Sequence, residues 1–258
     1  MKVSAGNIAS AGLIVLILLA LGFVLALTRH DSRDDTCGGI DVEIVEDWHF
    51  VEPEDVKGWV ETEYGHYLGQ KMDSLDLAGI ENMLDTKSAV LKSQVWVTED
   101  GILHVSITQR EPVVRFQTPE GGFYMDDRSC IFPLQHGYTA RVPVIDGYLP
   151  LKVREGYKGE VSDPDQKEWA DRVLLLVNHM KASGVWDKNI SQINVQENGD
   201  ILMVPRSGRE IFIFGKLEDI QDKFSRMEKY YTHIAPSKEK GYYGSVNLKY
   251  KGQIICRK

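Results

Sequence analysis

Cysteine is scarce in this chain of 258 residues, which has only three, Cys37, Cys130 and Cys256. They lie far apart in the sequence, and no two of them have the spacing of a metal site. Their odd number excludes complete pairing into disulfides. A bridge between Cys130 and Cys256 stays possible, although a free cysteine is often only a small buried hydrophobic side chain.

Signatures of catalysis are also missing. The chain has no nucleophile elbow, phosphate-binding loop, dinucleotide fingerprint or zinc helix, and its seven histidines show no ligand spacing. In the one adjacent carboxylate pair that we considered for acid–base chemistry, Asp126-Asp127, the side chains would point to opposite faces of a strand, so a turn is the better interpretation. We therefore expect no catalytic residue, no metal ligand and no cofactor.

Positive charge is in short supply, because the chain has 30 lysines and arginines against 38 acidic residues and a net charge of −8. The first 27 residues contain a single ionisable side chain, Lys2, so the remainder of the chain is more acidic still. This balance argues against nucleic acid and anionic lipid surfaces as partners.

One long hydrophobic run is present, from Ile8 to Leu27, and it contains no charged residue. About 20 apolar residues span a bilayer as a helix, whereas the apolar core of a cleaved signal peptide usually has about 7–15. We predict a retained transmembrane helix over residues 8–27. Lys2 on one side, and Arg29 and Arg33 on the other, do not decide its orientation by charge.

A hairpin is predicted around Asp100-Gly101, where apolar residues alternate with polar ones on both sides of a turn signal. A two-residue loop would mix apolar and polar side chains on each face. A three-residue loop, residues 99–101, pairs Val97 with Leu103 and Val95 with Val105. Glycine then takes the left-handed position that such loops need.

The elements before this hairpin complete a small α+β unit. Alternation over residues 40–45 predicts a strand, Pro53-Glu54-Asp55 opens a helix that ends at Gly65, and a second helix covers about residues 75–84. The resulting order is strand, helix, helix, strand, strand, which suits two helices on one face of a sheet. Pro112 cannot donate to a ladder, so strand pairing should change there.

After Pro112 the pattern predicts an antiparallel-rich sheet with two flanking helices. The first helix is expected to be capped by Ser162 and to end at Gly184, with an apolar face that runs from Trp169 to Met180. The second helix covers residues 217–231. Strands are expected at residues 113–117, 122–125, 130–134, 142–145, 190–196, 201–205, 210–214, 245–250 and 253–257.

Three segments carry a resemblance to the FtsQ/DivIB cell-division family. They are the hairpin with Arg110-x-Pro112, Val113-Val114 and Phe116, the step Pro143-Val144-Ile145-x-Gly147, and the closing strand Val246-Asn247-Leu248-Lys249-Tyr250. In that family a POTRA domain is followed by a β domain. Gln109 stands where the family usually has Glu, and Ser129 stands near a usual glycine.

The resemblance implies a division of the chain into five segments. They are a cytoplasmic tail (1–7), a transmembrane helix (8–27), a linker (28–39), a POTRA domain (40–111) and a β domain (112–258). It also implies a single-pass protein of the cytoplasmic membrane, enriched at the division septum, with its C-terminal domain on the periplasmic side. Arg110, Pro112 and Phe116 would form the interdomain junction.

The resemblance further implies a scaffold without enzymatic activity. Its partners would be FtsB- and FtsL-type proteins and, indirectly, the septal peptidoglycan synthase complex. The partner would add a strand to the sheet edge that the last strands expose. The residues expected there are Ser245, Val246, Asn247, Leu248, Lys249, Tyr250, Gln253 and Ile255.

Several points stay open at this edge. Lys249, Lys251, Arg257 and Lys258 would either guard it against aggregation or meet an acidic partner, and Tyr250 would either contact the partner or pack on the sheet. A charged residue or proline at positions 248–250 is expected to leave the fold largely intact. The alternative functions are a POTRA-bearing assembly or transport component, for which a membrane barrel is expected, and an anchored periplasmic enzyme.

Overall fold

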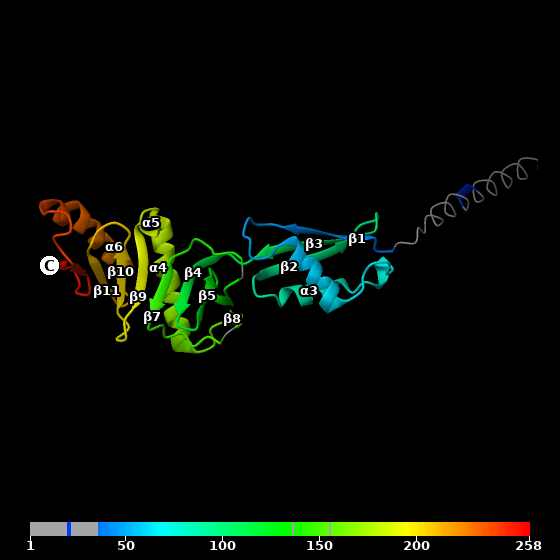
Figure 1. The fold of residues 1–258 in the computed structure, drawn as a ribbon, viewed down its shortest axis with the longest axis horizontal. Helices are drawn as coiled ribbons and strands as arrows, with labels where there is room; N and C mark the ends of the chain where they lie inside the picture. Colours follow the sequence, from blue (N-terminus) through cyan, green and yellow to red (C-terminus); the bar gives the residue numbers. More distant parts are fainter. Residues whose placement is uncertain (1–19, 22–35, 136, 155) are drawn as a thin grey trace, which may run out of the picture.

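The computed structural model describes residues 20–21, 36–135, 137–154 and 156–258. Within these ranges, a small sheet and a large sheet follow each other along the chain (Figure 1). The predicted membrane anchor, residues 8–27, lies outside the described residues except for Ala20 and Leu21. None of the described helices is both long and apolar enough to cross a bilayer.

The first sheet has three strands in the order β1-β3-β2. Their bounds are β1 Gly39–Ile44, β2 Val90–Val97 and β3 Ile102–Gln109. The predicted register is confirmed, because Val97 pairs with Leu103 and Val95 pairs with Val105. Gly101 has a φ of 83°, so the loop places its glycine in the left-handed region. β1 joins β3 in parallel, as a neighbour that the hairpin alone could not predict.

Two helices cover this sheet, and their bounds are α2 Pro53–Trp59 and α3 Leu77–Asp85. A π-helical turn, Val60–Tyr64, continues α2, and a short 3-10 turn, Met72–Ser74, precedes α3. Glu52 and Asp55 form a capping box around the start of α2. Ile80 and Leu84 of α3 are fully buried in one core with the apolar side chains of β2 and β3. The predicted order of strands and helices is therefore confirmed.

Side chains of α3 close the outer edge of β2. The Ser93 N–H donates to Asp85 Oδ1 at 2.7 Å, and the Val95 N–H donates to Glu81 Oε1 at 2.8 Å. Unpaired N–H groups at a sheet edge are a template for another strand. These two carboxylates occupy the donors, so this edge is protected against strand addition.

The second sheet has ten strands in the order β13-β12-β11-β10-β9-β7-β4-β5-β6-β8. Three neighbouring pairs are parallel, β11 with β12, β4 with β7, and β7 with β9; the other six are antiparallel, as expected of an antiparallel-rich sheet. The bounds are β4 Pro112–Thr118, β5 Gly121–Asp126, β6 Cys130–Pro133, β7 Val144–Gly147, β8 Gly159–Glu160, β9 Ile190–Val195, β10 Ile201–Pro205, β11 Ile211–Gly215, β12 Ser245–Asn247 and β13 Ile255–Arg257.

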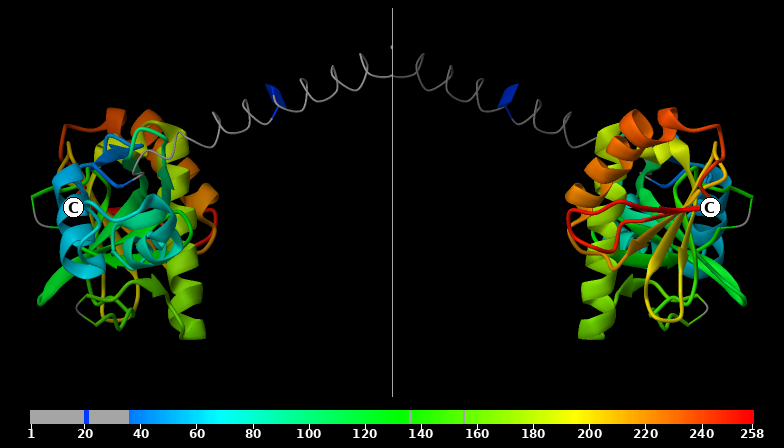
Figure 2. Two further views of the ribbon diagram at one scale, coloured as in Figure 1. Left: turned by 90° about the vertical axis from the view of Figure 1, so that its right-hand side faces the viewer. Right: turned by 90° about the vertical axis from the view of Figure 1, so that its left-hand side faces the viewer.

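Helices pack against one face of the large sheet (Figure 2). Their bounds are α4 Pro164–Ser183, α5 Trp186–Asn189 and α6 Ile220–Lys229, and α6 continues through a π-helical turn, Tyr230–Ile234, and a 3-10 turn, Ala235–Ser237. The predicted apolar face of α4 is confirmed, because Val173, Leu176, Val177 and Met180 are buried and Trp169 packs against them.

The caps of α4 correct one prediction and confirm another. Asp163, and not Ser162, is the N-cap residue, and its side chain accepts from the Gln166 N–H at 3.0 Å. Pro164 follows at the first helical position, where its missing N–H costs nothing, and this shifts the cap by one residue. Gly184 ends the helix with a φ of 63°, as predicted.

A buried ion pair joins the two sheets at the junction. Arg110 Nη1 lies 2.7 Å from Asp126 Oδ2, and the two side chains are only 11% and 3% exposed. The other oxygen of Asp126 accepts from the Cys130 N–H at 2.9 Å. Gln109, at the usual glutamate position, accepts from the Val51 N–H at 2.9 Å and is itself buried. Pro112 opens β4 opposite Asp126, so strand pairing does change there.

Lys158 makes a second link between the sheets. Its ammonium donates to the carbonyls of Asp85 at 2.5 Å, Lys87 at 2.7 Å and Val90 at 3.3 Å, where α3 passes into β2. Burial first, and then the charge of Arg110, lowers the pKa of Lys158. A lysine from the loop before β8 therefore satisfies carbonyls of the first sheet's domain.

Rings of both domains complete the junction. Phe50 meets Tyr124 at 5.4 Å, Phe132 at 6.1 Å and Tyr138 at 5.0 Å, between ring centroids, in edge-to-face geometry. Phe116, which was predicted at the junction, lies instead in the core of the large sheet, with its centroid 5.8 Å from that of Trp169.

The disulfide that the sequence allows between Cys130 and Cys256 does not form. Both thiols are free, and they lie in β6 and β13, near opposite ends of the ten-stranded sheet. Cys130 is buried, and its burial raises the pKa of the thiol. Each of these cysteines thus serves as an apolar side chain.

Removing the charge of Asp126 should weaken the fold more than removing an exposed charge beside it. We expect Asp126→Asn to lower the free energy of unfolding by about 3 kcal/mol, because Arg110 would stay buried without a counter-charge. Denaturant unfolding measures this. Glu111→Gln is the control: its pair with Lys181, 3.1 Å apart, is exposed, so the loss should be less than about 1 kcal/mol. Equal losses in the two variants would contradict the role given to the buried pair.

Candidate partner-binding site at the end of the large sheet

The last two strands form one end of the ten-stranded sheet. β12 lies between β11, its parallel neighbour, and β13, its antiparallel neighbour. β13 pairs on one side only, among the residues that the structure describes. Both strands are shorter than the expected residues 245–250 and 253–257. The edge of the sheet therefore belongs to β13, while β12 is paired on both sides.

Backbone directions identify which groups face outward from β13. The Leu248 N–H donates to Ile213 O at 2.9 Å. Backbone groups alternate in direction along a strand, so in β12 and at Leu248 the N–H and C=O groups of even-numbered residues point toward β11 and those of odd-numbered residues point toward β13. Ile255 and Arg257 pair with those odd-numbered residues, and their backbone groups point back to β12. The N–H and C=O of Cys256 consequently face away from the sheet.

The side chains predicted at this edge divide into three groups. Val246 and Leu248 are fully buried, so they support the sheet. Ser245, Asn247 and Ile255 are partly exposed. Lys249, Tyr250 and Gln253 are exposed. Leu248 was expected to tolerate a charged residue or proline; this is wrong, because its side chain lies in the core and its N–H is used by β11.

Arg226 holds the turn between β12 and β13. Its Nη1 donates to the carbonyls of Tyr250 at 2.8 Å and Gln253 at 2.7 Å, while its Nε and Nη2 bind Asp222. Arg226 is only 4% exposed, although it lies on α6. The sequence shows it as one of several charges on that helix, so periodicity alone could not single it out.

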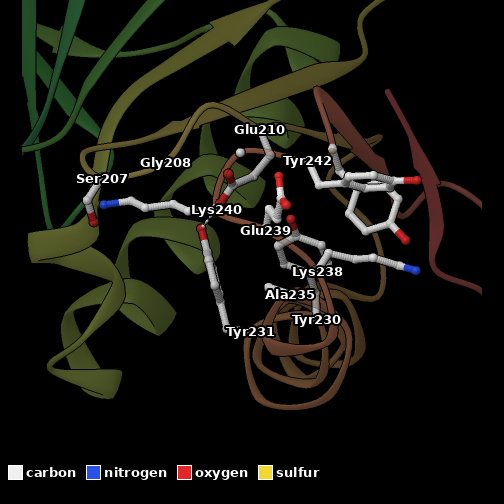
Figure 3. Close-up of a pocket in the computed structure, with 12 residues that line it drawn as sticks. Ser207, Gly208, Glu210, Tyr230, Tyr231, Ala235, Lys238, Glu239, Lys240 and Tyr242 are labelled. Carbon is white, nitrogen blue, oxygen red and sulfur yellow. Dashed lines mark hydrogen bonds between the residues drawn. The ribbon is translucent and has the colours of Figure 1, made fainter.

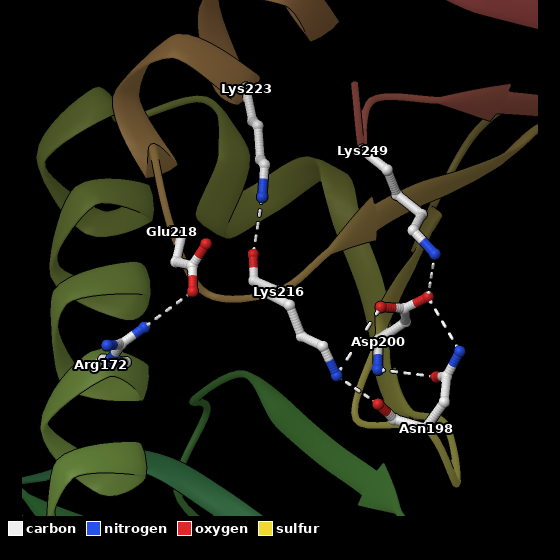
Figure 4. Close-up of polar contacts among 7 residues, drawn as sticks. All are labelled: Arg172, Asn198, Asp200, Lys216, Glu218, Lys223 and Lys249. Atoms are coloured by element: carbon white, nitrogen blue, oxygen red, sulfur yellow. Dashed lines mark hydrogen bonds and ion pairs between the residues drawn. The ribbon is translucent and has the colours of Figure 1, made fainter. Parts of the chain in front are cut away.

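Asp200 holds the Lys249 side chain (Figure 4). Lys249 Nζ lies 2.6 Å from Asp200 Oδ2, and Lys216 Nζ lies 3.9 Å from the other oxygen. Asn198 also donates to Asp200, at 3.1 Å. Lys258, the last residue, lies over the ring of Tyr242, 4.3 Å from its centroid. Two of the four basic residues at this end are therefore bound within the chain.

A cavity lined by tyrosines adjoins the same end (Figure 3). Glu210 is 6% exposed, and its carboxylate accepts from the Tyr231 hydroxyl at 2.7 Å and from the Arg209 N–H at 3.0 Å. Burial, and then the hydrogen bond from Tyr231 to Glu210, raises the pKa of Tyr231. The doublets Tyr230-Tyr231 and Tyr242-Tyr243 are the sequence signal that could have located this cavity.

Two family models match the chain. The model described as FtsQ/DivIB, C-terminal related, matches residues 111–257. The model described as a POTRA-like domain matches residues 35–108. A search of curated proteins found no significant match.

Acid should weaken this end of the sheet through Asp200. Burial raises the pKa of Asp200, but the hydrogen bond and the charge of Lys249 lower it more, so the pKa lies below its ordinary 3.8. The folded state therefore binds fewer protons there than the unfolded state. The resulting stabilisation is complete above pH 3.8 and is lost as the pH falls through the folded-state pKa.

The test compares Lys249→Met with the wild type in denaturant unfolding between about pH 6 and pH 2.5. The variant should lose less stability over this range, since the interaction that lowers the pKa is gone. Lys251→Met, in the same turn, should follow the wild type. Parallel pH profiles of Lys249→Met and the wild type would show that the pair does not lower this pKa.

Proposed function

Because this chain belongs to the FtsQ/DivIB, C-terminal related family, we propose that it is a non-enzymatic scaffold of the bacterial division machinery. The family match covers the residues that form the ten-stranded sheet, and the POTRA-like match covers the small sheet except for Gln109, the last residue of β3. The large sheet offers the edge of β13 for recognition, and both domains carry helices on one face of their sheet. Such surfaces gather partners and need no chemical step.

The proposed partners are FtsB- and FtsL-type division proteins and, through them, the septal peptidoglycan synthase complex. The edge of β13, which has a neighbouring strand on one side only in the described part of the chain, carries this proposal. A partner segment would add an eleventh strand beside β13, with main-chain hydrogen bonds to Cys256 for affinity. Tyr250, which is 54% exposed next to this edge, would supply a side-chain contact.

The proposed topology follows the family. Residues 1–7 would be a cytoplasmic tail, residues 8–27 the membrane helix and residues 28–39 a linker. Residues 40–111 would form the POTRA domain and residues 112–258 the β domain, both on the periplasmic side and enriched at the septum. A single membrane anchor would hold the edge of β13 within reach of other membrane-bound division proteins.

Proline at Cys256 should abolish partner capture, whereas alanine should not. Cys256→Pro removes an outward N–H that β12 does not use, and its ring blocks an incoming strand. Cys256→Ala removes the thiol and keeps the N–H. We expect the full chain with alanine to co-purify with an FtsB-type partner from detergent, and the chain with proline to lose at least tenfold in yield.

Circular dichroism of both variants controls for folding. Tyr250→Glu tests the side-chain contact separately and should reduce capture. Equal capture by Cys256→Pro and Cys256→Ala would rule out strand addition at β13.

Depletion of the protein in cells should give filaments that lack septa, because the proposed scaffold is needed to assemble the septal machinery. Phase-contrast and membrane-stain microscopy measures cell length and septum frequency. Re-expression of the wild-type chain should restore septa, while the Cys256→Pro chain should not. Division at the normal frequency after depletion would contradict the proposal.

A further inference from the structure

The cavity beside the end of the large sheet contains a buried carboxylate that has no ion-pair partner among the residues that the structure describes. Its volume is about 290 Å³. Glu210 lines it and is 6% exposed, and the two donors to its carboxylate, the Tyr231 hydroxyl and the Arg209 N–H, are neutral. No lysine, arginine or histidine of the described residues forms an ion pair with Glu210. A buried carboxylate in this position is costly until a cation reaches it.

Four tyrosines line the same cavity as the Glu210 carboxylate. They are Tyr230, Tyr231, Tyr242 and Tyr243. The ring centroids of Tyr230 and Tyr231 lie 5.1 Å apart, and those of Tyr242 and Tyr243 lie 5.0 Å apart. The faces of such rings attract a cation, and the attraction grows when the cation is removed from water. The carboxylate and the aromatic lining thus favour the same kind of occupant.

The lysines near the cavity do not neutralise Glu210. Lys238 and Lys258 lie over the ring of Tyr242, at 5.5 Å and 4.3 Å from its centroid. In Figure 3 the Lys240 side chain extends toward Ser207, away from the Glu210 carboxylate. The charge of Glu210 consequently remains available to a group from outside the chain.

The cavity lies near the C-terminal end of β13. Its lining residue Tyr243 is followed by Gly244, whose N–H donates to Arg257 O at 2.8 Å. Lys258, which directly follows β13, contacts the ring of Tyr242. A partner segment that lies along β13 and continues past Lys258 would come near the tyrosines that line the cavity.

We propose that this cavity receives a lysine or arginine side chain from the partner segment that lies along β13. The ammonium or guanidinium pairs with Glu210, and the tyrosine rings enclose the aliphatic stem and the charge. This assignment rests on the proposed function, in which a partner binds as a strand along β13. It adds a chemical requirement to that partner: a cationic residue next to the segment that pairs with Cys256.

The test uses the full chain in detergent micelles with 3-fluorotyrosine in place of tyrosine, followed by fluorine NMR. The Tyr231 signal is assigned by its disappearance in Tyr231→Phe. The probe is N-acetyl-lysine amide, and the uncharged comparison is N-acetyl-norleucine amide at equal ionic strength. We expect a saturable shift of the Tyr231 signal with the lysine probe, and at least tenfold weaker binding of the norleucine probe.

Two matched variants locate the interaction. Glu210→Gln should weaken binding of the lysine probe at least tenfold, while Glu239→Gln, the same change at an exposed acid on the rim, should leave it within twofold. Tyr242→Leu keeps Glu210 and removes a partly exposed ring, so it should also weaken binding and covers the case that Glu210→Gln does not fold. Unchanged binding in both Glu210→Gln and Tyr242→Leu, or equal binding of the two probes, would overturn the proposal.

Lys240→Met examines whether the chain fills its own cavity. If Lys240 occupied it in solution, this variant would lose as much thermal stability as Glu210→Gln, and that result would also overturn the proposal. Failure of the probe to bind, together with loss of partner capture in Cys256→Pro, would remove this inference and leave the proposed function standing.

Discussion

The backbone N–H and C=O groups at the edges of the two sheets constrain the rest of the structure. Each edge can pair with another chain unless it is covered or short, or unless it serves as a binding site. The edge of β2 is covered by the carboxylates of Glu81 and Asp85. At the start of β1, the Cys37 N–H donates to Gln70 O at 2.8 Å. β8 ends its sheet with only two residues. β13 differs from these three, since the outward groups of Cys256 have no strand beside them among the described residues.

The junction between the two sheets bears on how that edge is presented. Arg110 and Asp126 are both buried, and Lys158 reaches three carbonyls at the end of α3. Phe50 inserts between rings from the second domain. Polar and apolar contacts of this kind resist hinge motion, because a rotation would leave buried charges and carbonyls without partners. The small domain and the large sheet are thus joined by contacts that oppose a change in their relative orientation.

Local elements could be predicted from the sequence, and neighbours distant along the chain could not. The alternation of apolar and polar residues was enough to predict the length of the loop at Gly101, since a shift of one residue in the strand pairing would expose one apolar face. The apolar face of α4 followed from spacing. Nothing in the pattern around Val246 showed that β11 would pair with β12 in parallel, because that contact is made across an intervening helix. For the same reason, the roles of Arg226 and Glu210 could not be predicted, because they depend on carbonyls and hydroxyls that only the fold brings close.

The basic residues at the end of the chain show how the edge of β13 stays usable. Lysines beside a strand can prevent edge pairing, and this was one interpretation of the C-terminal cluster. Lys249 instead bonds to Asp200, and Lys258 lies over Tyr242. Lys249 and Lys258 thus both make contacts within the chain, and neither contact places an ammonium over the backbone of Cys256. Lys249 is paired with a carboxylate and Lys258 lies over an aromatic ring, whereas the carboxylate of Glu210 has no ion-pair partner among the described residues. An incoming strand would meet main-chain donors and acceptors at β13, the exposed Arg257 and Lys251 beside them, and the Glu210 carboxylate in the nearby cavity.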